Sequence, residues 1–186
     1  MEKILEMENI CKSFNGVKVL QNVSFDLRPG EVHALIGENG AGKSTLMKIL
    51  MGVYQADSGQ IKICGEPVRI HNPAQALSLG ISMVHQELSP VPEMSVAENI
   101  FIGREEGRFG FVNHSKQEQI TSEILGTFNL NISAKRKMGS LSVSEMQMVE
   151  ITKSICCNAK FIIMDEPTSA ITEAEVHKLF EVIRCL

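Results

Sequence analysis

The chain has 186 residues, of which 44% are apolar and 22% charged, and its formal net charge is −4. This composition predicts a globular protein with room for one core and a small second lobe. No run approaches the roughly 18 uninterrupted apolar residues of a membrane span, and the first ten residues contain three glutamates where a signal peptide is basic and then apolar. Since there is also no basic block, we expect a cytoplasmic protein with no nucleic-acid partner.

Cysteine and histidine give no sign of a metal site or a disulfide framework. The five cysteines, at positions 11, 64, 156, 157 and 185, include no C-x-x-C pair. Free cysteine usually packs as a small apolar residue, so we expect them to be buried. His33 and His177 have no second ligand at metal spacing, which favours a packing or surface role for both.

The first third of the chain has the alternation of half-buried strands. Apolar residues recur with period two over 5–7, 17–19 and 23–27, and Asn15-Gly16 is a hairpin signal between the first two runs. The turn 28–30 follows, and after position 50 Ser58-Gly59 predicts a turn into another strand with Ile61 and Ile63 inward. We therefore expect an antiparallel sheet.

A glycine-rich stretch, which we call the P-loop, lies between an apolar run at 32–36 and a helix-like run at 46–50. It fits G-x-x-x-x-G-K-[ST], and its flanks predict the order strand, loop, helix. Glycines let a backbone wrap a phosphate, a lysine adds a positive charge, and a serine offers a hydroxyl to Mg²⁺. The alternative is a glycine-rich turn with no ligand. The predicted nucleotide-binding residues are Gly37, Glu38, Asn39, Gly40, Ala41, Gly42, Lys43, Ser44 and Thr45.

The middle of the chain reads as mainly helical. Asn72 and Pro73 predict a helix start and Gly80 its end, after which 81–84 is a short apolar strand. Ser95 and Glu98 form a capping box that opens a second lobe, helical through Phe128 after a loop at 103–110. Ser142 and Glu145 form a second capping box, before a helix with apolar positions at 148, 151 and 155. This helix start is either an anion site or a cap alone.

An acidic pair follows the apolar run 161–164. A carboxylate at a strand end, as at Asp165, is what a P-loop site needs to hold Mg²⁺, and the adjacent Glu166 is placed to orient or deprotonate an attacking water. The alternative is a solvated acidic turn. From Glu173 the apolar positions 176, 179, 180 and 183 predict an amphipathic helix.

These motifs together resemble the nucleotide-binding domain of ABC transporters. The residues that carry the resemblance are the P-loop, Gln86 after its apolar strand, the segment 141–145, and 165–169. More narrowly, 82–88 and 141–148 resemble the ATPases of bacterial importers of monosaccharides of the galactoside and ribose type, in their N-terminal part. The resemblance covers nearly the whole chain. It implies an α/β P-loop NTPase (RecA-like) core with an antiparallel β subdomain and a helical subdomain. The core would comprise 1–87 and 159–186, and the helical subdomain 88–158.

The resemblance also implies roles for single residues. Phe14 would stack on adenine, unless it is a core residue, and Gln86 would contact Mg²⁺ or water and couple the site to a permease, unless it is a surface glutamine. Residues Ser142, Val143, Ser144 and Glu145 would close over the γ-phosphate of ATP held by a second ATPase domain, fused or in trans. We call 141–145 the signature segment. His85 either lines the coupling surface or only ends a strand.

The chain departs from the family pattern in ways that bear on its activity. Val143 and Ser144 stand where the family has glycines, Glu145 where it has glutamine, and Thr172 where it has aspartate. A carboxylate at 145 is repulsive toward phosphate. The family's switch histidine lies on a further strand, which this sequence does not reach, so we expect a C-terminally truncated part of a longer polypeptide.

The leading hypothesis is an ATPase subunit, peripheral on the cytoplasmic face of the membrane, that uses ATP and Mg²⁺ to drive a monosaccharide permease served by a sugar-binding protein. The alternatives are a domain that binds ATP without efficient turnover, and a soluble ABC ATPase outside transport. The absence of basic arms in the sequence disfavours the second alternative.

Overall fold

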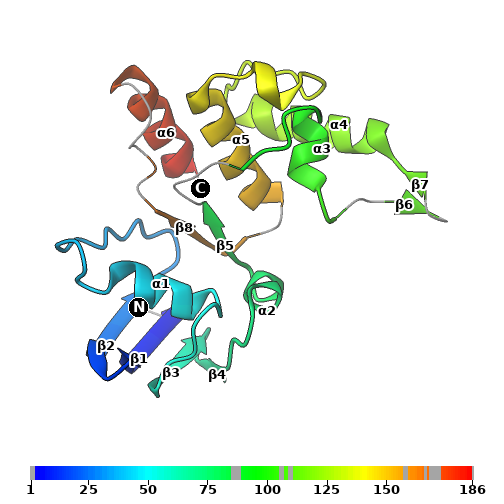
Figure 1. Ribbon diagram of the computed structural model, residues 1–186. Coiled ribbons are helices and arrows are strands. Elements are labelled where there is room, and N and C mark those ends of the chain that lie inside the picture. Colours follow the sequence, from blue (N-terminus) through cyan, green and yellow to red (C-terminus); the bar gives the residue numbers. More distant parts are fainter. Residues whose placement is uncertain are drawn as a thin grey trace. The chain divides into compact units, whose positions relative to one another are not determined.

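The computed structural model describes residues 3–84, 89–104, 107–108, 111–156, 159–165, 167 and 173–185. These residues form two units, 1–82 and 83–186, with the boundary inside a short strand. Apart from that strand, each described helix and strand lies within one unit (Figure 1). The predicted division into a core of 1–87 and 159–186 and a helical subdomain of 88–158 remains a prediction.

The first unit contains the predicted antiparallel sheet. Its strands are β1 (Leu5–Phe14), β2 (Val17–Leu27), β3 (Ser58–Ile63) and β4 (Glu66–Val68), in the order β2-β1-β3-β4. All three neighbouring pairs are antiparallel, as Figure 1 shows in blue and cyan. The inward alternation of Leu5, Met7, Ile61 and Ile63, all of them buried, places one face of the sheet on a core.

The hairpin between β1 and β2 forms at the predicted turn. Asn15 and Gly16 have φ of 48° and 82°, which is the left-handed pair of a type I′ turn. The runs 17–19 and 23–27, which the sequence presents as separate, belong to one strand, β2. It is irregular at Asn22, with φ 51°, and the register with β1 shifts nearby.

Two helices complete the first unit. The helix α1 (Lys43–Leu50) buries Leu46, Ile49 and Leu50. The helix α2 (Pro73–Ser78) is capped as predicted, because the side chain of Asn72 accepts a hydrogen bond from the backbone N–H of Gln75 at 2.9 Å.

The strand expected before the P-loop does not form. Residues 31–42 have no regular secondary structure, and among the described strands none pairs with 32–36. The side chains of Val32 and Ile36 are 72% and 91% exposed. A strand needs a neighbour for its backbone N–H and C=O groups, so the apolar pattern alone does not produce one here.

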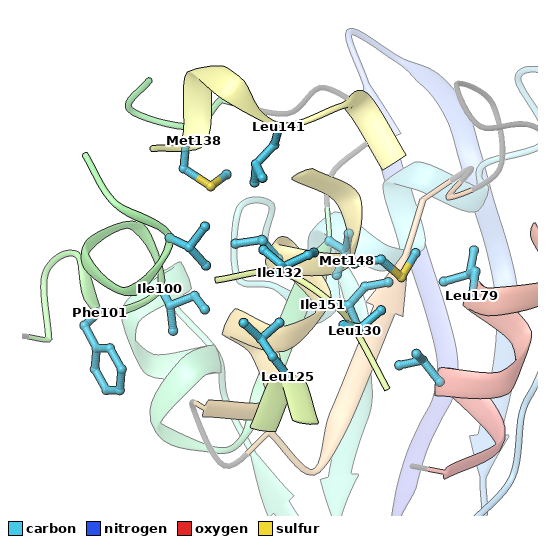
Figure 2. Close-up of a cluster of buried hydrophobic side chains, with 14 residues drawn as sticks. Ile100, Phe101, Leu125, Leu130, Ile132, Met138, Leu141, Met148, Ile151 and Leu179 are labelled. Atoms are coloured by element: carbon cyan, nitrogen blue, oxygen red, sulfur yellow. The ribbon is translucent and has the colours of Figure 1, made fainter. Parts of the chain in front are cut away.

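The second unit is mainly helical. Its helices are α3 (Val96–Phe101), α4 (His114–Thr127), α5 (Val143–Cys156) and α6 (Glu173–Cys185), with a 3₁₀ turn η1 (Met138–Ser140). The strands β5 (Ile81–Val84) and β8 (Phe161–Met164) pair in a two-stranded sheet. Figure 2 shows the buried cluster that holds the unit together, which includes Ile100 from α3, Leu125 from α4, Ile151 from α5 and Leu179 from α6.

Some predicted details of the second unit and of the cysteines are wrong. The loop 103–110 contains part of a small hairpin, β6 (Gly107–Arg108) with β7 (Phe111–Val112), which the sequence reasoning missed. Phe180 is 47% exposed on α6, whereas Val182 is buried. Of the described cysteines, Cys64 is exposed and Cys11 and Cys156 are half-buried. Cys64 lies in the β3–β4 turn with φ 51°, where its side chain faces outward.

Among the described residues, none of the helices has the length and apolar composition of a membrane span.

Candidate nucleotide site

The P-loop has the backbone that its glycines were predicted to provide at two of three positions. Gly40 and Gly42 have φ of 86° and 89°, in the left-handed region that favours glycine, whereas Gly37 does not lie there. At Gly37 the constraint is space, because an added Cβ would lie 3.3 Å from Cβ of Ala41. The loop turns between Glu38 and Ala41, where the Ala41 N–H donates to the Glu38 carbonyl at 3.1 Å.

Gly42 joins the loop to the sheet as well as to the helix. It is the N-cap of α1, and an added Cβ would lie 2.6 Å from Cδ2 of Leu20 and 3.2 Å from the carbonyl oxygen of Val19. A Cβ at 2.6 Å would force the buried Leu20 side chain to move, and the contact with the Val19 oxygen would be tight, so β2 leaves little room for a side chain at this position. The first turn of α1 is thereby fixed against β2.

The side chain of Lys43 folds back over the loop. Its Nζ donates to the carbonyl oxygens of Gly37 at 2.6 Å and Glu38 at 2.9 Å. These bonds hold a positive charge at the mouth of the loop, beside the positive end of α1. The Ser44 side chain is exposed at the same helix start, and Thr45 is half-buried.

Phe14 lies at the end of β1 in a small aromatic and cationic cluster. Its ring meets that of Tyr54 edge to face with centroids 5.1 Å apart, and Nζ of Lys12 lies 5.4 Å from the ring centroid. Lys12 also bonds Asp57 at 2.8 Å, and the Ser13 N–H donates to the second Asp57 oxygen at 2.6 Å. The Lys12 bond, followed by that of Ser13, holds the pKa of Asp57 below its usual value. Phe14 is half-buried, so both of its predicted roles stay open.

The start of α5 confirms the predicted capping box. The Glu145 N–H donates to Oγ of Ser142 at 3.2 Å, and the Ser142 N–H donates to Oε2 of Glu145 at 2.8 Å. Val143 is 50% exposed and Ser144 half-buried, with the two serine hydroxyls 3.1 Å apart. The signature segment is therefore an ordered helix start, with two small hydroxyl side chains at its surface.

Glu145 has a partner that the sequence reasoning missed. Nη1 of Arg136 donates to Oε1 of Glu145 at 2.7 Å. Burial alone would raise the pKa of Glu145, but the Ser142 N–H and the Arg136 guanidinium outweigh it and hold the pKa below its usual range. Arg136 and Glu145 are nine positions apart, and no local spacing rule predicts a contact between them. The turn through η1 brings the two side chains together. The signal in the sequence is limited to the presence of Arg136 upstream of Glu145, which stands where the family pattern has glutamine.

Asp165 follows β8, as predicted. Its backbone N–H donates to the carbonyl of Val84 at 3.2 Å, which ties the acidic turn to the end of β5. The side chain is half-buried. Gln86 and Glu166, the two predicted catalytic residues, lie outside the described residues, as do His85 and Thr172. The P-loop and Phe14 lie in the first unit, and Asp165 and the signature segment lie in the second.

Comparison with known proteins decides the family. The family model described as ABC transporter matches residues 20–169, which is most of the chain and includes the P-loop, the signature segment and the acidic turn. The chain belongs to the ABC transporter family. Solved structures agree: the ADP conformation of MJ1267, an ATP-binding cassette of an ABC transporter, has a TM-score of 0.86 at 32% identity, covering 99% of this chain and 76% of that one. The predicted P-loop NTPase fold is confirmed.

Curated relatives of this ABC transporter chain are longer. The putative ribose/galactose/methyl galactoside import ATP-binding protein of Hahella chejuensis is 53% identical over 186 residues, which is 100% of this chain and 36% of the relative. The galactose/methyl galactoside import ATP-binding protein MglA of Escherichia coli is 50% identical over 185 residues, which is 100% of this chain and 37% of the relative. The chain thus spans just over a third of the relatives' length and corresponds to their N-terminal part.

Proposed function

We propose that this chain is the nucleotide-binding part of an ABC importer subunit that hydrolyses ATP to drive uptake of a monosaccharide. The observation that carries the proposal is the P-loop geometry, in which Gly40 and Gly42 take left-handed backbone angles and Lys43 folds over the loop at the start of α1. The relatives are import proteins for ribose and galactosides by name, and they supply the substrate class of this proposal.

The loop residues fit the phosphates of ATP. The backbone from Gly37 to Ala41 is exposed and turned by glycine, and a lysine ammonium and a helix start converge on it. Ser44, Asp165 and Gln86 are the proposed residues around Mg²⁺, which when bound offsets the charge of the β- and γ-phosphates. Glu166 is the proposed residue that orients or deprotonates water.

The remaining elements of the proposal concern partners. Ser142 to Glu145 would contact ATP held by a second ATPase domain, and a permease subunit with its sugar-binding protein would receive the motion. The subunit would then lie on the cytoplasmic face of the membrane, held there by the permease.

The test uses the protein at its native length and compares wild type with the variants Lys43→Ala and Glu166→Gln. Wild type is expected to bind ATP with Mg²⁺ and to hydrolyse it. K43A is expected to lose most binding, because the cation over the loop is gone. E166Q is expected to bind ATP and lose about 100-fold or more in hydrolysis rate, the range of a general base. Nucleotide titration and phosphate release measure both quantities.

Each other outcome has a meaning. If wild type and E166Q both bind ATP and neither hydrolyses it, the result favours a domain that binds ATP without turnover. Equal ATP binding by wild type and K43A contradicts the nucleotide site itself. The hydrolysis rate is also measured in membranes with and without an overexpressed permease. A rate that the permease does not change favours an ATPase outside transport.

A further inference from the structure

The guanidinium of Arg136 links the turn that precedes α5 to the first turn of that helix. Nη1 donates to Oε1 of Glu145 at 2.7 Å, Nε donates to Oγ of Ser140 at 3.1 Å, and Nη2 donates to the carbonyl oxygen of Ser140. The hydroxyl of Ser140 donates in turn to the carbonyl oxygen of Lys137 at 2.8 Å. Arg136 therefore braces the turn and reaches the first turn of α5 in one planar fork.

Both carboxylate oxygens of Glu145 accept hydrogen bonds from groups at or just before the start of α5. Oε1 accepts from Arg136, and Oε2 accepts from the backbone N–H of Ser142 at 2.8 Å. The side chains of Arg136 and Glu145 are 38% and 29% exposed, so the pair is partly shielded from solvent. Its charges are screened less than those of a pair on the open surface.

This arrangement bears on the departure at position 145. A carboxylate in the first turn of a helix that is to approach a phosphate repels it, and it also occupies the positive helix end that would attract the phosphate. Arg136 brings one positive charge to the same carboxylate. The two side chains together are neutral, and the carboxylate is turned back onto Ser142 and Arg136.

We propose that Arg136 is a positioning residue of the signature segment, which holds and neutralises Glu145 so that the start of α5 admits the γ-phosphate of ATP. This inference rests on the proposed function. Arg136 acts through Glu145 and is not itself assigned a contact with nucleotide. The Arg136–Glu145 pair, which has no net charge, thus takes the place of the uncharged glutamine that the family pattern has at position 145.

The test compares Arg136→Gln, Glu145→Gln and the double variant in the protein at its native length. R136Q is expected to lower kcat for ATP hydrolysis about three- to tenfold at about 0.1 M salt, as befits a partly screened unit charge. The double variant is expected to recover most of the loss, because no carboxylate remains to repel phosphate. At about 1 M salt, where the Debye length falls to about 3 Å, the defect of R136Q should shrink.

Lys137→Gln is the matched control. Nζ of Lys137 lies 3.0 Å from Glu93 in an exposed pair, whose side chains are 65% and 86% exposed, and removal of this neighbouring charge is expected to leave hydrolysis unchanged. If R136Q fails to fold by circular dichroism, Arg136→Lys replaces it. R136K keeps the charge but loses the fork, and it is expected to hydrolyse ATP close to the wild-type rate.

Two results would overturn the inference alone: R136Q with wild-type kcat, or a double variant as slow as R136Q, which would show that Arg136 only braces the turn. A wild-type protein that does not hydrolyse ATP overturns the proposed function, and the inference with it. The wild-type rate therefore separates the two failures.

Discussion

Gly42 is the residue at which the nucleotide loop, α1 and β2 constrain one another. Its φ of 89° is strained for other residues, and a Cβ 2.6 Å from Cδ2 of the buried Leu20 would force that side chain to move. Gly42→Ala is therefore expected to destabilise the protein by about 2 kcal/mol or more and to weaken ATP binding. Urea unfolding and nucleotide titration measure the two effects.

Gly65→Ala provides the control for Gly42→Ala. Gly65 has φ 81°, but an added Cβ would meet nothing within 4 Å, so only the backbone strain is present. G65A is expected to cost less stability than G42A and to leave ATP binding intact. Equal losses in the two variants would contradict the steric part of the argument.

Glu98 is a residue whose charge state sets the strength of a helix cap. It accepts from the Ser95 N–H at 2.7 Å, and this backbone bond is the main reason that the pKa of Glu98 lies below its ordinary value. A carboxyl with a depressed folded pKa contributes stability that is full above its unfolded pKa of about 4.3 and is lost as pH falls through the folded value. Glu98→Gln is therefore expected to be less stable than wild type at about pH 7, with a smaller deficit at about pH 3. Urea unfolding at both pH values checks this, and a deficit independent of pH would contradict it.

At the scale of elements, α3 is joined to the segment before it by one buried amide. Asn99 is 4% exposed; its Oδ1 accepts from the Val91 N–H at 2.8 Å, and its Nδ2 donates to the carbonyl oxygens of Val91 and Ser95, both at 3.0 Å. Asn99→Ala leaves the Val91 N–H without its partner, and an unpaired buried group typically costs about 1–3 kcal/mol. The carbonyl oxygens of Val91 and Ser95 keep the bonds that they accept from the backbone N–H groups of Met94 and Asn99. We expect a lower urea midpoint for N99A.

The exposed Asn131 provides the comparison for Asn99. Asn131→Ala is expected to change stability by less than about 0.5 kcal/mol, as surface substitutions usually do. If N99A unfolds at the same urea concentration as N131A, the three hydrogen bonds of Asn99 are not important for stability.

The elements that the sequence predicted well are those defined by local signals. The hairpin at Asn15-Gly16 and the caps at Asn72, Ser95 and Ser142 depend on residues within four positions of one another, and all are confirmed. The P-loop angles at Gly40 and Gly42 belong to the same class. The fold class followed from these motifs together with a family resemblance.

The features that sequence reasoning missed depend on partners distant in the chain. The Arg136–Glu145 pair needs the turn through η1, and the contact of Phe14 with Tyr54 needs β1 to lie beside the segment after α1. The run 32–36 has the composition of a strand, but composition does not supply a neighbour. The catalytic assignments of Gln86 and Glu166 remain predictions.

For the whole molecule, the run 32–36 raises a question of solution behaviour. Val32, Leu35 and Ile36 are exposed and close together in sequence, and an apolar, β-prone stretch with which no described strand pairs is a template on which a second chain can add a strand. Within the sequence 31–36 the one acidic residue is Glu31, which accepts from the ring of His33 at 3.1 Å. Self-association of the chain at high concentration would therefore begin next to the P-loop, so that aggregation and nucleotide binding would compete for the same stretch of backbone.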